Sequence, residues 1–440
     1  MTRKLLALIA VAITSWTGVA AANGRFPFAN HLVVDPSDDK HLVVRTTYGI
    51  VQSFDAGASW KWLCEQSVGY GGAFDPAIAV TGTGRGLVGL FDGLTTTTDR
   101  GCTYVLAKDA VVTKQFMIDF VVQPTTPTRA LALTSTGSAD GFHVVVAESN
   151  DGGGTWAQLG VDLPKDFNSE TLEIAASRPD RIYLSGVFGE PRQGVIEKTD
   201  DGGKTWERLA FDLKGGLAPY LAAVDPKDPD VVYVRLDGNA TEGQGDSLWV
   251  SRDGAKTWAQ LGQAKADMLG FALSPDGSKI AFGGPSDGIW LTSTVTPSPT
   301  KVSSVGARCL TWSAAGLYAC GNEYPDGFTV GLSKDEGKTF QALNHLAVLS
   351  PLQCASTTTT GELCGKEWPK VQATIGVDDD AGVTTDAGPA PTPAADSDNH
   401  GCTCTHGAKN TAIPTGLALA SALLALTRKR KKLREDSRQH

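Results

Sequence analysis

An eight-residue pattern recurs six times along this chain of 440 residues and constrains its fold more than any other feature. The pattern is Ser/Thr-x-Asp-x-Gly-x-Thr/Ser-aromatic, and we call it the turn motif. Its carboxylate can accept hydrogen bonds from nearby backbone N–H groups, and its glycine supplies the positive φ that tight turns use. We therefore predict a structural role, not a catalytic one, for the six motif carboxylates: Asp55, Asp99, Asp151, Asp201, Asp253 and Asp335.

The spacing of the motif indicates a repeat array. Successive motif aspartates are separated by 44, 52, 50, 52 and 82 residues. The last interval fits two units, because a degenerate copy, Gly288-Ile-Trp290, lies within it without a following motif. A period near 50 residues is typical of propellers and related repeat folds.

Each repeat contains about four short β-rich runs, and the motif separates the third run from the fourth. We predict an all-β, seven-bladed β-propeller between about Phe28 and Ile375. Six or eight blades stay possible, because the segment 344–375 could complete the seventh blade or cap it. Glycine (50) and proline (22) are abundant and 41% of residues are hydrophobic, which argues against both a helical bundle and a disordered chain.

The turn motif resembles the Asp-box, or BNR, repeat of β-propellers found in sialidases, sortilin-type receptors and photosystem assembly factors. The resemblance implies the propeller fold but leaves function open, since such propellers serve as hydrolases, lectins and scaffolds. A sialidase-type site would also need an arginine cluster, a Tyr–Glu pair and an Arg-Ile-Pro motif. Arg25-Phe26-Pro27 echoes only the last of these, and we interpret it as the tail of the mature N-terminus.

Both ends of the sequence predict export. Residues 1–22 have two positive charges, an apolar run and a small-residue cleavage site, which is typical of a signal peptide. The propeller should then span 23–376, followed by an acidic, proline-containing linker at 377–400. Residues 401–440 combine a cysteine motif, an apolar segment predicted to be a transmembrane helix, and a basic tail.

The order of these C-terminal features resembles the myxobacterial C-terminal sorting signal. The resemblance implies processing near Cys402 or Cys404 and delivery to the cell surface. A metal site at these cysteines is the weaker alternative, because structural zinc sites space paired ligands by at least two residues. We predict no metal and no cofactor for this protein.

The remaining six cysteines predict disulfides in an exported chain. We expect the pairs Cys64–Cys102, Cys309–Cys320 and Cys354–Cys364, although sequence alone leaves the connectivity open.

Long connections between the second and third strands of several repeats suggest a binding rim on one face. Neutral drift of exposed loops explains their length equally well. The candidate rim residues are Phe188, Arg192, Asn239, Glu242, Glu323 and Tyr324.

These observations favour a non-enzymatic recognition or scaffold module for protein or glycan at the cell surface. The alternative is a glycoside hydrolase or lyase with its site at the propeller axis. An assembly factor would differ only in its partner. The net charge of −9 disfavours nucleic acid and anionic membrane surfaces as partners.

Overall fold

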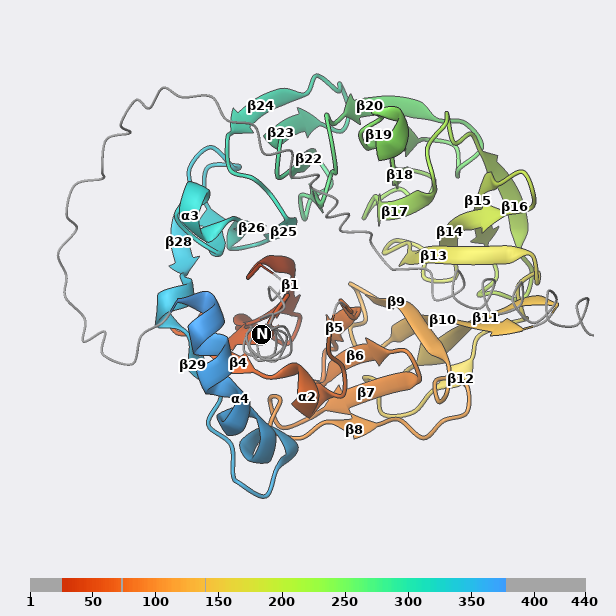
Figure 1. The fold of residues 1–440 in the computed structure, drawn as a ribbon. Coiled ribbons are helices and arrows are strands. Elements are labelled where there is room, and N and C mark those ends of the chain that lie inside the picture. The colour runs from red at the N-terminus through yellow and green to blue at the C-terminus, as the bar shows by residue number, and fades with distance from the viewer. Residues whose placement is uncertain (1–25, 73, 139, 377–440) are drawn as a thin grey trace, which may run out of the picture.

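The computed structural model describes residues 26–72, 74–138 and 140–376, which form seven antiparallel sheets arranged around one axis (Figure 1). The prediction of an all-β, seven-bladed propeller is confirmed. The predicted signal peptide, acidic linker and transmembrane segment, together with Cys402 and Cys404, lie outside the described residues.

Each blade contains four consecutive strands of the chain. Blades 1 to 3 are β1–β4 (Ala29–Asp35, Asp38–Thr46, Gly49–Ser53, Lys61–Leu63), β5–β8 (Ile78–Val80, Gly86–Leu90, Gly93–Thr97, Val105–Leu106) and β9–β12 (Phe116–Val122, Ala130–Ser138, Gly141–Ser149, Ala157–Gln158). Blades 4 and 5 are β13–β16 (Phe167–Ile174, Ile182–Phe188, Gln193–Thr199, Glu207–Phe211) and β17–β20 (Pro219–Val224, Val232–Leu236, Ser247–Ser251, Ala259–Gln263). Blades 6 and 7 are β21–β24 (Gly270–Leu273, Lys279–Gly284, Gly288–Ser293, Thr300–Ser303) and β25–β28 (Cys309–Ser313, Gly316–Cys320, Val330–Ser333, Gln341–Asn344).

The first strand of every blade contacts the first strands of its two neighbours, so these strands form the inner ring. Because adjacent strands are antiparallel, connections emerge alternately on two opposite faces. The connections from second to third strand, and those from blade to blade, share the surface we call the loop face. The connections from first to second and from third to fourth strand share the opposite surface, the turn face.

Seven apolar clusters hold the blades together, one between each adjacent pair. The aromatic residue of each turn motif enters the cluster between its own blade and the preceding one. Trp60, for example, is 1% exposed between blades 1 and 7, and its indole N–H lies 2.8 Å from the carbonyl oxygen of Leu343. Blade 6 keeps its four strands without a turn motif.

The segment after Asn344 does not complete the seventh blade, because β28 already provides the fourth strand of that blade. It instead forms a strap of a short 3-10 turn η2 (Leu346–Val348), strand β29 (Ser350–Pro351) and helix α4 (Thr359–Ile375). Strand β29 pairs in parallel with β4, adding a fifth strand to blade 1. Helix α4 then lies against α2 (Glu65–Val68), which follows blade 1.

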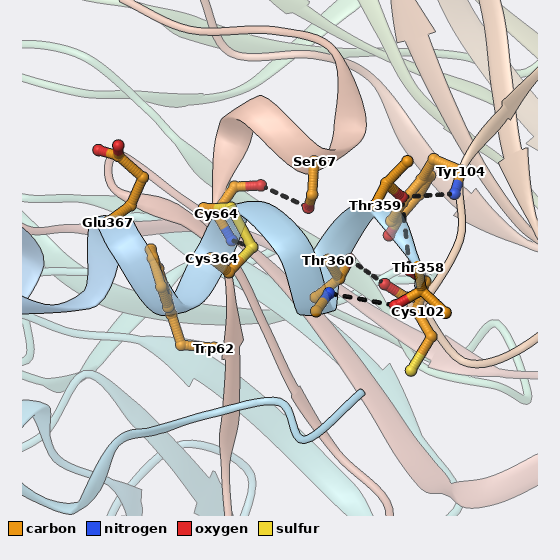
Figure 2. The surroundings of a disulfide bond; sticks show 12 residues. Trp62, Cys64, Ser67, Cys102, Tyr104, Thr358, Thr359, Thr360, Cys364 and Glu367 are labelled. Carbon is orange, nitrogen blue, oxygen red and sulfur yellow. Dashed lines mark hydrogen bonds between the residues drawn. A yellow bond between two sulfur atoms is a disulfide. The ribbon is translucent and has the colours of Figure 1, made fainter. Parts of the chain in front are cut away.

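Two disulfides fasten this strap, and they correct two predicted pairings. Cys364 bonds to Cys64 (Figure 2). Cys354 bonds to Cys102, so the expected Cys64–Cys102 and Cys354–Cys364 pairs are wrong. The expected pairs join cysteines that are close in sequence or belong to adjacent blades. The strap instead passes beside blades 1 and 2, and it brings Cys364 to Cys64 and Cys354 to Cys102. Cys309 bonds to Cys320 across the β25–β26 hairpin, as expected.

No helix in the described part of the chain is long and apolar enough to cross a membrane.

Candidate functional site

The six motif aspartates lie on the turn face, where each accepts hydrogen bonds within its own turn. In every copy a carboxylate oxygen accepts the backbone N–H four residues later, at 2.8–3.0 Å. The Thr205 backbone and hydroxyl groups beside Asp201 lower the pKa of that carboxyl to about 2. This geometry occupies the carboxylates locally and keeps them on the face opposite the long loops.

Two of the candidate rim residues, Phe188 and Arg192, lie in blade 4 and differ in exposure. Phe188 ends β14 and is partly buried, with the Arg208 guanidinium 4.6 Å from its ring centre. Arg192 is exposed and donates to the carbonyl of Leu217 at 3.4 Å. The positive charge of Arg192 also acts to lower the pKa of Glu170, a carboxyl of the inner ring.

Two further rim candidates, Asn239 and Glu242, belong to the long β18–β19 loop. Asn239 precedes the 3-10 turn η1 (Ala240–Glu242), and its side-chain Oδ1 accepts a hydrogen bond from the Thr241 hydroxyl at 2.6 Å. Glu242 is exposed at the loop tip. Both therefore lie on the loop face.

The last two candidates, Glu323 and Tyr324, open the short helix α3 (Glu323–Asp326) between β26 and β27. Glu323 is partly buried, and one of its oxygens lies 3.2 Å from His345 Nδ1. Tyr324 is 71% exposed. The structure thus brings Glu323 and Tyr324 together in blade 7, apart from the candidates in blades 4 and 5.

Within the described residues, three side chains of phenylalanine, tyrosine or tryptophan are exposed, and all three lie on the loop face. They are Tyr324, Phe26 (48% exposed) and Phe91 (53% exposed). Phe26 precedes blade 1, and Phe91 lies in the β6–β7 turn of blade 2. The exposed rings therefore follow the arc of blades 7, 1 and 2.

Neighbouring rings hold the exposed pair Phe26 and Tyr324 in place. The two rings meet edge to face, with centres 6.4 Å apart, and Phe26 also packs 4.6 Å from Phe28. The Arg308 guanidinium lies 3.3 Å from the centre of the Phe28 ring. A cation packed on a ring in this way stabilises its position.

Phe91 is supported from both sides. Its ring centre lies 4.1 Å from that of Phe74 and 5.1 Å from that of Phe116, the first residue of β9. The ring is thus fixed while half of its surface faces solvent. Rigid, exposed rings are characteristic of binding surfaces because little entropy is lost when a ligand covers them.

A second group, the inner cluster, lies at the loop-face end of the first strands of blades 4 and 5. It contains Glu170 on β13, Tyr220 on β17, Arg235 on β18, and Asp237 and Asp246 from the β18–β19 loop. The Tyr220 hydroxyl hydrogen-bonds the Glu170 carboxyl. The Arg235 guanidinium lies 4.4 Å from the Tyr220 ring centre and 2.7 Å from Asp246.

Burial changes the acidity of the inner cluster. It raises the pKa of Glu170 to about 7 and that of Asp237 to about 6. Arg235 contacts Asp237 at 3.7 Å as well as Asp246, so its positive charge is already compensated. The cluster is therefore acidic overall and presents no unpaired guanidinium to an anionic ligand.

Two more carboxyls lie deeper in the inner ring. Asp119 of β9 accepts the backbone N–H of Leu172 at 3.1 Å, and burial raises its pKa to about 7. Burial raises the pKa of the neighbouring Glu173 to about 8, and the charge of Asp119 adds to this shift. Shifted carboxyls of this kind are candidates for function, although buried ion networks can produce them too.

The sequence interpretation missed the inner cluster, the deeper carboxyls and Phe91. Asp119 interrupts the apolar run Phe116–Val122, and Glu170 and Glu173 lie within strand β13, so charges inside β-rich runs were an available signal. Nothing local showed that Phe74, Phe91 and Phe116 would meet. No group of three or more His, Cys, Asp or Glu side chains in the described ranges is arranged to hold a metal ion.

No protein-family model matches the sequence, and no curated protein matches it. Among solved structures, an ancestral GH74 enzyme is similar with a TM-score of 0.52 at 15% identity, over 72% of this chain. The match covers 46% of that enzyme, so the chain spans about half of its length. A Kuenenia stuttgartiensis hydrazine synthase chain is similar with a TM-score of 0.50 at 11% identity, over 70% of this chain and 96% of that one. At these identities the likeness shows the propeller fold alone.

Proposed function

We propose that this protein is a non-enzymatic recognition module that binds its partner on the loop face. The observation that carries the proposal is the placement of Phe26, Phe91 and Tyr324, the three exposed aromatic side chains of the described residues, on that one face. Exposed aromatic rings are enriched at binding hot spots. The long loops of blades 4, 5 and 7 emerge on the same face and extend it.

The chemistry of the carboxylates supports binding over catalysis. The motif aspartates are engaged by their own turns. In the inner cluster the one arginine, Arg235, is already paired with Asp246 and is therefore not open to an anionic sugar. The exposed Arg192 acts on Glu170 from outside the cluster.

We further propose that the propeller is exported and held at the cell surface through its C-terminal segment. The three disulfides support an oxidising compartment, and the patterns at both ends of the sequence support export. Fractionation of the producing cells tests this. The protein should be protease-accessible on intact cells, and Cys402→Ala with Cys404→Ala should release or mislocalise it. Retention of the protein that carries both cysteine substitutions at the surface would contradict the anchoring proposal.

Binding of the labelled full-length protein to intact producer cells tests the recognition function. Phe91→Ala and Tyr324→Ala should each reduce the bound amount. Val295→Ala is the matched control, because Val295 is 80% exposed on the turn face. Equal binding of all variants would show that the loop face is not the recognition surface.

A second candidate, glycoside hydrolysis, is favoured by one observation. Glu170 has a pKa of about 7 and is hydrogen-bonded to Tyr220, so it could donate a proton near neutral pH. Release of nitrophenol from a panel of nitrophenyl glycosides tests this function. Turnover that Glu170→Gln abolishes while binding to cells persists would establish the enzyme, and turnover that the variant leaves unchanged would exclude this site.

A further inference from the structure

The two faces of the propeller differ in charge. The seven connections from second to third strand, all on the loop face, carry nine Asp or Glu residues and one basic residue, Arg192. Including the connections between blades, this face has 16 acidic and 7 basic residues. The loop face is therefore strongly acidic.

The turn face is close to balanced. Its third-to-fourth-strand connections carry eight acidic and six basic residues, and with the first-to-second-strand connections the totals are 13 and 11. Six of these acidic residues are the motif aspartates, which bond within their own turns. The excess negative charge in the connections is thus concentrated on the face that also exposes the aromatic rings.

The exposed rings stand directly beside carboxylates. Phe91 is followed by the exposed Asp92, and Tyr324 lies between Glu323 and Asp326 on α3. A lysine or arginine side chain can place its charge over an aromatic ring while it pairs with an adjacent carboxylate. Rings and acids interleaved in this way suit a cationic side chain better than a neutral apolar surface.

The separation of the rings favours an extended partner. Tyr324 and Phe91 belong to blades 7 and 2, and the connection between blades 1 and 2, which carries Glu65 and Asp75, separates Phe91 from the ring pair Phe26 and Tyr324. A compact hydrophobic protein surface would need one continuous apolar patch. An extended chain can present successive side chains to separate rings.

We propose that the loop face binds a basic polypeptide segment whose lysine or arginine side chains lie on the exposed rings of Phe91 and Tyr324, with the exposed Asp92 next to Phe91. This inference rests on the proposed recognition function and names the chemistry of its partner. Opposite charges would also guide the encounter and make binding sensitive to salt.

Fluorescence polarisation with the full-length protein tests the proposal. The probes are a fluorescent peptide of alternating lysine and glycine, the matching serine–glycine peptide, and a neutral cello-oligosaccharide. The lysine peptide should bind, about ten-fold more weakly when the salt is raised from 0.05 to 0.5 M, and the other two should not. Phe91→Ala and Tyr324→Ala should each weaken binding about three-fold.

Matched controls distinguish binding at the loop face from nonspecific attraction of the lysine peptide to an acidic protein. Asp92→Asn should weaken binding of the lysine peptide, whereas Asp39→Asn, which removes an equally exposed charge on the turn-face side, should not. Val295→Ala should also leave the affinity unchanged. Equal effects of Asp92→Asn and Asp39→Asn, with no effect of the two aromatic variants, would overturn the proposal.

The outcomes distinguish this inference from the function on which it rests. If the neutral oligosaccharide binds and Tyr324→Ala abolishes that binding, the proposal of a basic partner is overturned, whereas the proposal of recognition by the loop face is supported. Cell binding that survives both aromatic variants, with no peptide binding, would overturn both.

Discussion

Cys364 in helix α4 is disulfide-bonded to Cys64 at the end of β4, 300 residues earlier in the sequence, and its sulfur accepts the Cys64 backbone N–H at 2.9 Å. Nearby, Cys354 is bonded to Cys102 in the turn motif of blade 2. The strap also places Trp368 of α4 5.3 Å from Trp62 of β4, measured between ring centres. The C-terminal strap therefore fixes the beginning of the ring to its end.

Removing the Cys64–Cys364 bond should lower the free energy of unfolding substantially. The double variant Cys64→Ala/Cys364→Ala should lose about 3–5 kcal/mol, because with Cys102–Cys354 intact the bond still closes a loop of about 50 residues in the unfolded chain. Cys309→Ala/Cys320→Ala, with a sequence separation of 11, should lose less, about 2–3 kcal/mol. Guanidinium denaturation without reductant measures both. Peptide mapping that joined Cys64 to Cys102 would contradict the pairing itself.

Stability should fall as pH rises from about 4.5 to about 8. Asp119, Glu170 and Glu173 have folded-state pKa values of about 7, 7 and 8, above their ordinary values. The folded state therefore binds more protons than the unfolded state across this window, and stability is greatest at its acidic end. Thermal unfolding at a series of pH values measures the slope.

Glu173→Gln should flatten this dependence, because the glutamine cannot ionise. Below about pH 4 the trend should reverse. The depressed pKa of motif carboxyls such as Asp201 and Asp253, each about 2, gives stability that is lost as they protonate. A melting temperature that rises steadily up to pH 8 would contradict the assignment of raised pKa values to the inner ring.

Ser53→Ala should destabilise the first turn motif. The Ser53 hydroxyl is fully buried, donates to Asp55 at 2.8 Å and accepts the backbone N–H of Gly57 at 2.8 Å. Its loss leaves a buried N–H without a partner, which should cost about 1–3 kcal/mol. Ser59→Ala in the same turn is the control, because the exposed Ser59 hydroxyl can be replaced by water. Urea denaturation should show the larger loss for Ser53, and equal losses would argue against the buried hydrogen bond as the cause.

Replacing Ala255 of the fifth motif by glycine should hardly change stability, whereas replacing Gly57, the equivalent residue of the first motif, by alanine should lower it. Ala255 is buried with a φ of 70°, so Ala255→Gly relieves about 1–2 kcal/mol of backbone strain. The change also loses a buried methyl group and adds chain entropy, about 1–2 kcal/mol together, so stability should change by less than about 1 kcal/mol. Gly57 has a φ of 93°, and a Cβ there would meet Leu343 Cδ1 at 2.9 Å. Gly57→Ala should therefore cost about 2 kcal/mol or more, and a neutral result would contradict this packing.

Much of the fold could be predicted from the sequence because its main determinant is local. The hydrogen bonds of the motif aspartate and of the Ser or Thr two residues before it join residues no more than four apart, as in Ser53, Asp55, Gly57 and Ser59. A pattern of eight residues therefore encodes a whole turn, and its spacing indicates the length of one repeat. Blade 6 could be placed without its motif because its strands and the interval of 82 residues remained.

The candidate site was less predictable. Tyr324 and Glu323 could be proposed from loop length, but Phe91 could not, because its support by Phe74 and Phe116 comes from three separate loops. The Glu170–Tyr220 contact likewise joins two blades across 50 residues of sequence. Such contacts depend on the closing of the ring, which no local pattern describes.

The sequence by itself determined the propeller fold and the local role of the motif aspartates, since those rest on interactions within single turns, and it favoured seven blades over six or eight. Only the tertiary structure decided which cysteines pair, which carboxyls meet at the inner ring and that the exposed aromatic rings share one acidic face. These features depend on distances between residues up to 300 positions apart. Such distances are set when seven apolar interfaces close into a ring, so they are properties of the assembled core.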